Sequence, residues 1–255
     1  MKKLLLLLTI LFTFSVNSQI VVMTAVDLKE GAEDEYLKLE KFYAGIHKEA
    51  IKQGLRTGWS LWKTAGNEDD PSAPEYILFD SYTVEQYEAI QNGTVSQDGA
   101  QLAQMAYKGK MSKRAIQKMA SSWQDSSKER RVYTLKVIDA TILAGGDIKS
   151  GDKVTINFMN KKTEDFENYE TKVWKPVAEK NILLGNLRQW ALVEAIGRSD
   201  NARTGWTNMV FNLQADNPGE WAGNSGFKWE KLWEGVESAR DMTDPSELTC
   251  VMSIN

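Results

Sequence analysis

The sequence has 255 residues, with 31 basic and 35 acidic side chains but one histidine and one cysteine. A net negative chain repels phosphate groups, and no Lys/Arg-rich run interleaved with aromatic residues is present, so we expect no nucleic-acid binding. A single cysteine rules out an intrachain disulfide. One His and one Cys cannot form a zinc site of the usual type, and calcium-loop spacing is absent, so we expect no metal site.

The first eighteen residues read as a secretory signal. Lys2 and Lys3 precede an unbroken apolar stretch over 4–14, and the best cleavage position follows Ser18. The apolar stretch is shorter than the ~20 residues that a membrane-spanning helix needs. We therefore expect an exported protein, periplasmic or secreted, with no membrane anchor after cleavage. About 237 residues remain, with 29 of the 31 basic side chains against 35 acidic ones.

The first half of the remaining chain predicts strand, helix, two strands, helix and strand. Apolar, β-branched runs cover 20–26, 57–64, 75–82 and 131–139, and helical periodicity covers 32–53 and 113–124. The order βαββαβ is the split βαβ arrangement of ferredoxin-like folds. Extra sequence at 91–111, with a short helix predicted at 101–107, reads as a surface elaboration or as a lid over one end of the fold.

The second half predicts the same order. Strand-like runs cover 154–158, 187–194, 206–213 and 247–253, and helical patterns cover 164–184 and 227–240. Pro176 falls inside the first of these helices, where it removes a backbone donor, so we expect a kink or a late helix start there.

A weak internal repeat links the two halves. Gly54 and Trp59 recur as Gly185 and Trp190, each pair offset by 131 residues, at the end of the first helix of each half. The offset predicts a tandem duplication, with a first unit over 19–139, a linker over 140–152 and a second unit over 153–255.

Several strands are apolar on both faces, which a sheet covered by helices on one side does not require. The second face needs another apolar surface, and the other half of the chain can provide it. Together with the element order and the Gly-to-Trp helix ends, this pattern resembles the dimeric α/β barrel superfamily. The resemblance implies an α+β protein, with two tandem ferredoxin-like βαββαβ units packed sheet to sheet as an intrachain dimeric α/β barrel.

The sequence lacks the motifs of several common enzyme classes. The sequence holds no G-x-S-x-G motif and no phosphate-cradling glycine loop. Some families of the barrel superfamily bind haem through a histidine, so the resemblance permits haem at His47, although the matching position in the second half is Ala178. A partly buried His47 without a ligand is the simpler interpretation, and we expect no cofactor.

Two sets of residues are candidate functional groups. If Asp80, near the end of its strand, faces the barrel interior, it is a candidate for proton transfer on a bound ligand or for a structural hydrogen bond to an arginine such as Arg56 or Arg188. His47 is the other candidate catalytic residue. Aromatic residues on facing strands are candidates to line a pocket for a flat or apolar ligand, or to form plain core. These residues are Trp59, Trp62, Tyr76, Trp190 and Trp206.

The sequence leaves three functions open. The leading one is binding of a small, mainly apolar or aromatic ligand in or beside the barrel. The second is a haem-dependent or cofactor-free oxidoreductase, and the third is a non-enzymatic envelope interaction module.

Overall fold

The computed structural model describes residues 19–66 and 73–255. The predicted signal sequence lies outside the described residues. Across the described ranges no helix is both long enough and apolar enough to cross a membrane.

The first half contains every predicted element, with small changes of boundary, and one further helix. Its elements are β1 (Gln19–Leu28), α1 (Glu33–Lys52), β2 (Gly58–Thr64), β3 (Tyr76–Thr83), α2 (Val84–Gln91), α3 (Gly99–Ala106), α4 (Lys113–Ser121) and β4 (Ser127–Ala140). Helix α1 carries three acidic residues in its first turn, which suits the positive end of the helix dipole. The chain leaves it through Gly54 at φ +71°, a left-handed conformation that favours glycine.

The second half comprises β5 (Lys153–Lys161), α5 (Phe166–Tyr169), a π-helical turn (Glu170–Trp174), α6 (Lys175–Leu183), β6 (Leu187–Arg198), β7 (Asn208–Gln214), α7 (Phe227–Ala239), β8 (Arg240–Met242) and β9 (Ser246–Ile254). The long helix predicted over 164–184 is therefore divided. Pro176 stands in the first turn of α6, directly after the π-helical turn, because proline is tolerated there and not in a helix interior.

The strands close into one antiparallel barrel of eight. Within the first half the order is β4-β1-β3-β2, and within the second it is β9-β5-β7-β6. The pairs β4–β6 and β2–β9 join the halves at both edges. Strand β8 lies outside this ring and pairs with the end of β5. The protein is therefore α+β, with the two sheets joined edge to edge as well as facing one another.

Both faces of the barrel wall are packed, as the apolar strands predicted. The interior holds Met23, Trp62, Phe79, Leu135, Ile156, Met209 and other apolar side chains from both halves. Phe211 of the second half meets Phe79 and Trp62 of the first edge-on, at centroid distances of 5.9 and 5.8 Å. The two halves therefore share one core.

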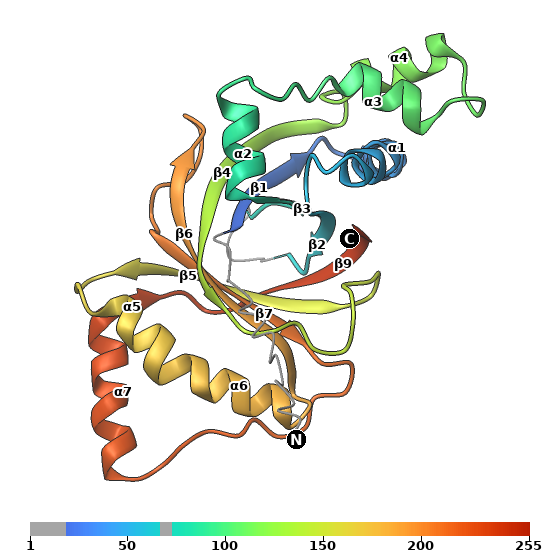
Figure 1. Cartoon of the computed structure of the whole chain (residues 1–255). Coiled ribbons are helices and arrows are strands. Elements are labelled where there is room, and N and C mark those ends of the chain that lie inside the picture. Colours follow the sequence, from blue (N-terminus) through green and yellow to red (C-terminus); the bar gives the residue numbers. More distant parts are fainter. Residues whose placement is uncertain (1–18, 67–72) are drawn as a thin grey trace, which may run out of the picture.

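The outer face is covered by two groups of helices on opposite sides of the barrel (Figure 1). Helix α1 packs over the first half, and α5 to α7 lie on the other side over the second half. Trp59 is buried in the outer cluster of the first half, and Trp190 in that of the second.

The insertion at 91–111 packs against α1. The Tyr107 hydroxyl donates to the Phe42 carbonyl at 2.8 Å, and the two rings stack at 4.9 Å. A Cβ on Gly45 would come within 2.5 Å of that hydroxyl, so this position needs glycine for the helices to approach. None of its residues lines the three cavities of the barrel described below. This placement favours a surface elaboration over a lid on the barrel.

Helix α2 was not predicted. It begins at a capping box in which Thr83 and Gln86 exchange side-chain and backbone hydrogen bonds. The T-x-x-Q spacing is a recognised signal for the start of a helix, so α2 could have been predicted from the sequence.

Candidate ligand-binding site

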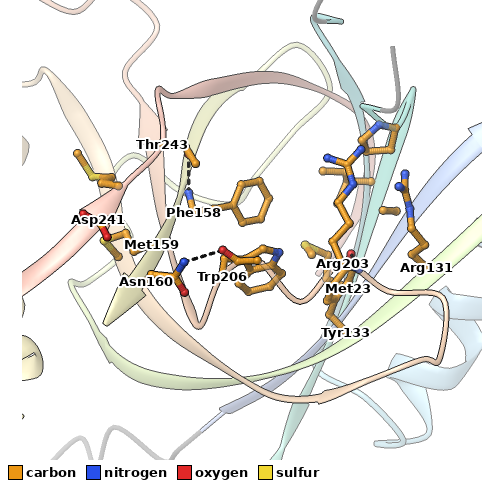
Figure 2. Close-up of a pocket in the computed structure, with 15 residues that line it drawn as sticks. Met23, Arg131, Tyr133, Phe158, Met159, Asn160, Arg203, Trp206, Asp241 and Thr243 are labelled. Carbon is orange, nitrogen blue, oxygen red and sulfur yellow. Dashed lines mark hydrogen bonds between the residues drawn. The ribbon is translucent and has the colours of Figure 1, made fainter. Parts of the chain in front are cut away.

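A cavity of about 380 Å³ opens at one end of the barrel. Its walls come from both halves of the chain, as Figure 2 shows: Met23 and Tyr133 from the first, Phe158 and Trp206 from the second. The other lining residues are Ala25, Pro74, Ile77, Arg131, Met159, Asn160, Arg203, Gly205, Asp241, Met242 and Thr243. The lining is mainly apolar, with a few polar groups.

Three aromatic rings form one wall of this cavity. Trp206 contacts Phe158 at a centroid distance of 4.9 Å and Tyr133 at 5.1 Å, both tilted. The Arg198 guanidinium lies 5.0 Å from the Trp206 ring. Trp206 is 7% exposed, so its indole is held in place before any ligand arrives.

Hydrogen bonds fix the loop between β6 and β7 that presents Trp206. The Asn160 side-chain amide donates to the Gly205 carbonyl at 2.7 Å, and the Arg203 amide donates to the Tyr133 hydroxyl at 3.0 Å. Thr243 accepts from the Phe158 amide at 3.1 Å (Figure 2). Contacts of the loop between β6 and β7 with β4 and β5 therefore hold the aromatic wall of the cavity in place.

Charged groups also line the cavity. The Arg131 guanidinium pairs with Asp27 at 2.7 Å, and Asp241 pairs with Lys162 at 2.7 Å. Arg203 lines this cavity and also an adjoining one of about 420 Å³, which is lined further by Thr64, Ser246 and Glu247. A third cavity of about 150 Å³ lies among apolar interior residues and Ser60, Ser81 and Gln189.

The five aromatic candidates do not gather around one cavity. Trp206 lines the cavity just described, and Trp62 lies in the barrel interior, where its indole donates to Ser60 at 2.7 Å. Trp59 and Tyr76 face outward beneath α1, and Trp190 faces outward beneath α6. Alternate residues of a strand point to opposite faces, and Trp59 and Trp62 are three residues apart. The expectation of a shared pocket is therefore corrected for four of the five.

His47 and Asp80 do come together, but on the outer face of the barrel. The Arg56 guanidinium contacts both His47 Nδ1 and Asp80 Oδ1, and the latter two atoms are 3.5 Å apart. Arg56 also donates to the Gln97 side chain at 3.0 Å. Asp80 thus accepts from Arg56, as the structural interpretation predicted, although it does not face the barrel interior.

Burial controls the protonation of this cluster. It raises the pKa of Asp80 to about 6, against the opposing influence of Arg56. Burial also lowers the pKa of His47 well below its ordinary value, and the positive charge of Arg56 lowers it further. A neutral His47 therefore lies beside a carboxyl that titrates near pH 6.

The surroundings of His47 do not fit a haem ligand. Its ring stacks on Trp59 at a centroid distance of 4.7 Å and an interplanar angle of 11°, and Nδ1 contacts Arg56. The side chain is 14% exposed and lines none of the cavities described above. None of these cavities adjoins the His47 ring, so we derive no haem chemistry at this position.

The pH dependence of stability should distinguish His47 from Asp80. His47 is held neutral in the fold while the unfolded chain takes up a proton below about pH 6.5, so its contribution to stability falls as the pH falls. We expect the stability of His47→Gln, relative to the wild type, to be higher at pH 5 than at pH 7. Urea unfolding at the two pH values measures this.

Asp80 has the opposite sign. The fold keeps its proton up to about pH 6, whereas the unfolded chain loses it near pH 3.9. Its contribution is therefore complete below pH 3.9 and lost as the pH rises through 6. Relative to Asp80→Asn, the wild type should gain about 1 kcal/mol between pH 7 and pH 5. Equal curves for the wild type and both variants would contradict this account of the cluster.

Sequence reasoning missed most of the cavity wall. Tyr133, Phe158, Arg131 and Arg203 were not singled out, because strand alternation alone does not say which end of a barrel each residue reaches. The loop over 199–207 offered one signal, because Trp206 comes just before a strand and such a residue can lie at the rim of a barrel. Within the described ranges, no cluster of three or more His, Cys, Asp or Glu side chains could hold a metal ion.

No protein-family model matches the chain, and no curated protein matches it in sequence. Solved structures do match in fold. A protein described as a "Putative monooxygenase" from Fusobacterium nucleatum subsp. nucleatum ATCC 25586 aligns with TM-score 0.55 and 11% identity, over 94% of this chain and 95% of its own.

A second protein, from Lactobacillus acidophilus NCFM and described in the same words, aligns with TM-score 0.52 and 10% identity. It covers 92% of this chain and 96% of its own. At such identities the likeness concerns the fold. With its closed antiparallel barrel of eight strands, the chain has the dimeric α/β barrel fold of the ferredoxin-like class that the sequence resemblance predicted.

Proposed function

We propose that this protein binds a small, mainly apolar ligand in the cavity at the Trp206 end of the barrel. The observation that supports this most is the preformed wall of Tyr133, Phe158 and Trp206 around about 380 Å³ of space. Small-molecule sites typically occupy 300 to 1,000 Å³, and they combine apolar walls with a few placed polar groups.

The mouth of a barrel is a common place for such a site. Aromatic walls bind flat apolar groups well, because each ring buries a large area and offers offset or edge-on contacts. Because the hydrogen bonds of Asn160 and Thr243 already hold the wall, little ordering accompanies binding, and that favours affinity.

Titration calorimetry with 2-naphthalenemethanol tests this proposal. We expect saturable binding to the wild type and about tenfold weaker binding to Trp206→Leu, because one stacking face is lost. Trp221→Phe is the matched control, since Trp221 is 44% exposed and lines none of the cavities described above. Absence of binding to the wild type would leave the envelope interaction module as the better hypothesis.

Oxygenase chemistry is a weaker candidate. Two proteins of similar fold are described by the words "putative monooxygenase", but His47 and Asp80 lie beside Trp59 on the outer face of the barrel wall and do not line the cavity. A ligand in the cavity would therefore be out of reach of both groups, so we propose binding without proton transfer by this pair.

We also propose that the two halves are duplicated ferredoxin-like units, over 19–139 and 153–255, joined by the linker at 140–152. The strand orders β4-β1-β3-β2 and β9-β5-β7-β6 correspond element by element. Trp59 and Trp190 occupy matching places beneath the first helix of each half. Ala178, at the position that matches His47, packs in the Trp190 cluster, whereas His47 stacks on Trp59. The cluster of His47, Arg56 and Asp80 therefore belongs to the first unit.

Export remains part of this proposal on the strength of the first eighteen residues. We expect the mature protein to begin at Gln19 and to be recovered outside the cytoplasm, in the periplasm or the medium. Amino-terminal sequencing of the protein from fractionated cells measures this. A retained Met1 in that fraction would contradict cleavage.

A further inference from the structure

We infer that the barrel holds a second binding site, at the end opposite Trp206, for a neutral ligand made of one aromatic ring with a hydroxyl group. The site is the small cavity of about 150 Å³ among apolar interior residues and Ser60, Ser81 and Gln189. This small cavity shares no lining residue with the cavity at the Trp206 end. The inference therefore goes beyond the proposed function and does not depend on it.

Strands β1 and β4 show that the two cavities lie toward opposite ends of the barrel. Val21 of β1 and Val137 of β4 line the small cavity, whereas Ala25 and Tyr133 of the same strands line the cavity at the Trp206 end. The two positions on each strand are four residues apart, which is about 13 Å along a strand. Because β1 and β4 are antiparallel neighbours, both displacements point the same way. The small cavity is therefore a separate site in the same barrel.

The wall of the small cavity is apolar and uncharged. Ten of its fourteen lining residues are apolar, and none carries a charge. Val21, Val137, Ile148 and Phe211 pack against the core yet are only partly buried, so apolar surface faces open space here. An apolar ligand would remove that surface from water, which is favourable. An ionic ligand would lose its hydration without finding a partner, which is costly.

The volume and the aromatic side chains of the small cavity fit a single ring. A protein cavity of about 150 Å³ with apolar walls takes up benzene. Phe79 and Phe211 both line the small cavity and meet edge-on, with 5.9 Å between their centroids. Aromatic rings prefer edge-on or offset contacts with one another, so a ligand ring can pack against this pair.

Polar side chains in the wall provide partners for a hydroxyl group. The Ser60 hydroxyl already accepts a hydrogen bond from the Trp62 indole at 2.7 Å. The Ser81 hydroxyl and the Gln189 amide have no hydrogen-bond partner among residues 19–66 and 73–255. A serine hydroxyl and a glutamine amide each offer a donor and an acceptor. Both can therefore form a hydrogen bond with a ligand hydroxyl.

One wall of the small cavity comes from the segment over 140–152, which hydrogen bonds hold in place. Ile148 of this segment lines the cavity, and its carbonyl accepts from the Ser253 hydroxyl and, at 3.3 Å, from the Asn255 side chain. Arg188 donates to three further carbonyls of the segment. The cavity is therefore formed before a ligand arrives, which lowers the cost of ordering on binding.

Methionine methyl groups distinguish the two cavities experimentally. Met209 lines the small cavity, whereas Met23, Met159 and Met242 line the one at the Trp206 end. In NMR spectra of the full chain with 13C-labelled methionine methyl groups, we expect phenol at pH 7 to shift the Met209 signal saturably. The concentrations that do so should leave the other three signals unchanged. Benzoate, which has the same ring and a negative charge, should shift the Met209 signal only at concentrations at least about tenfold higher.

Two variants test the site in different ways. Ala191 lines the small cavity, so Ala191→Leu should fill part of it and weaken phenol binding at least about tenfold. The double variant Ser81→Ala/Gln189→Leu keeps the cavity and removes two polar groups, so it should weaken phenol binding about tenfold and leave toluene binding unchanged. Ala100→Leu, at an exposed position of α3 that lines none of the three barrel cavities, is the control. The remaining methionine signals check that each variant is folded.

The outcomes separate this inference from the proposed function. If phenol leaves the Met209 signal unchanged, or shifts only Met23, Met159 and Met242, the second site is wrong, whereas binding of 2-naphthalenemethanol at the Trp206 end is unaffected by that result. If Ala191→Leu binds phenol as the wild type does, the ligand lies elsewhere and the inference is wrong. If benzoate binds as tightly as phenol, or the double variant weakens phenol and toluene equally, the assigned class of ligand is wrong.

Discussion

Replacing Arg56 by Met is expected to lower the free energy of unfolding by about 3 to 5 kcal/mol. The Arg56 side chain is 9% exposed and joins Asp80, His47 Nδ1 and Gln97 beneath α1. Its loss leaves Asp80 as a buried carboxylate without its principal cation. Urea unfolding of the wild type and the variant at pH 7 measures the change.

A double-mutant cycle identifies the cause. Asp80→Asn removes the buried charge but keeps the shape, so Arg56→Met combined with Asp80→Asn should be less destabilised than the two separate losses added together. The penalty of Arg56→Met should also be smaller at pH 5, because the Asp80 carboxyl, whose pKa burial already raises to about 6, is then largely protonated. A penalty that is additive and independent of pH would mean that lost packing, and not the buried charge, explains the effect.

Replacing Arg188 by Met should have a comparable effect, about 3 to 5 kcal/mol, through the connection between the halves. Arg188 pairs with the Asp152 carboxylate at 2.6 Å. It also donates to the carbonyls of Ala144, Gly146 and Asp147 at 3.1, 2.8 and 3.1 Å. One side chain of β6 thus fixes most of the segment over 140–152, and thermal or urea unfolding measures the loss.

Local proteolysis distinguishes an effect on this segment from a general one. In Arg188→Met, cleavage within 141–152 should accelerate more than cleavage elsewhere, because the carbonyls there lose their donors. Arg198→Met is a matched control, since Arg198 lies on the same strand but bonds to the Trp206 carbonyl. Equal cleavage of the segment in both variants would contradict an anchoring role for Arg188.

The sequence by itself determined the order of the elements and the class of fold. Local periodicity predicts strands and helices. The predicted strand ranges agree with β1 to β4 and with β5, β6, β7 and β9 to within a few residues. The apolar character of both strand faces indicated a second packed surface, and the contact of Phe211 with Trp62 and Phe79 is that surface. These features depend on residues close together in the sequence, so one sequence is enough to predict them.

Tertiary structure decided which side chains meet. Trp59 and Trp62 share a strand, yet one stacks on His47 outside the barrel and the other fills the interior, because successive side chains alternate between faces. The cavity joins Tyr133 of β4 to Phe158 of β5 and to Trp206 before β7. Such contacts depend on how the barrel closes and on which strand ends share a rim, and neither is encoded in the local pattern of any one segment.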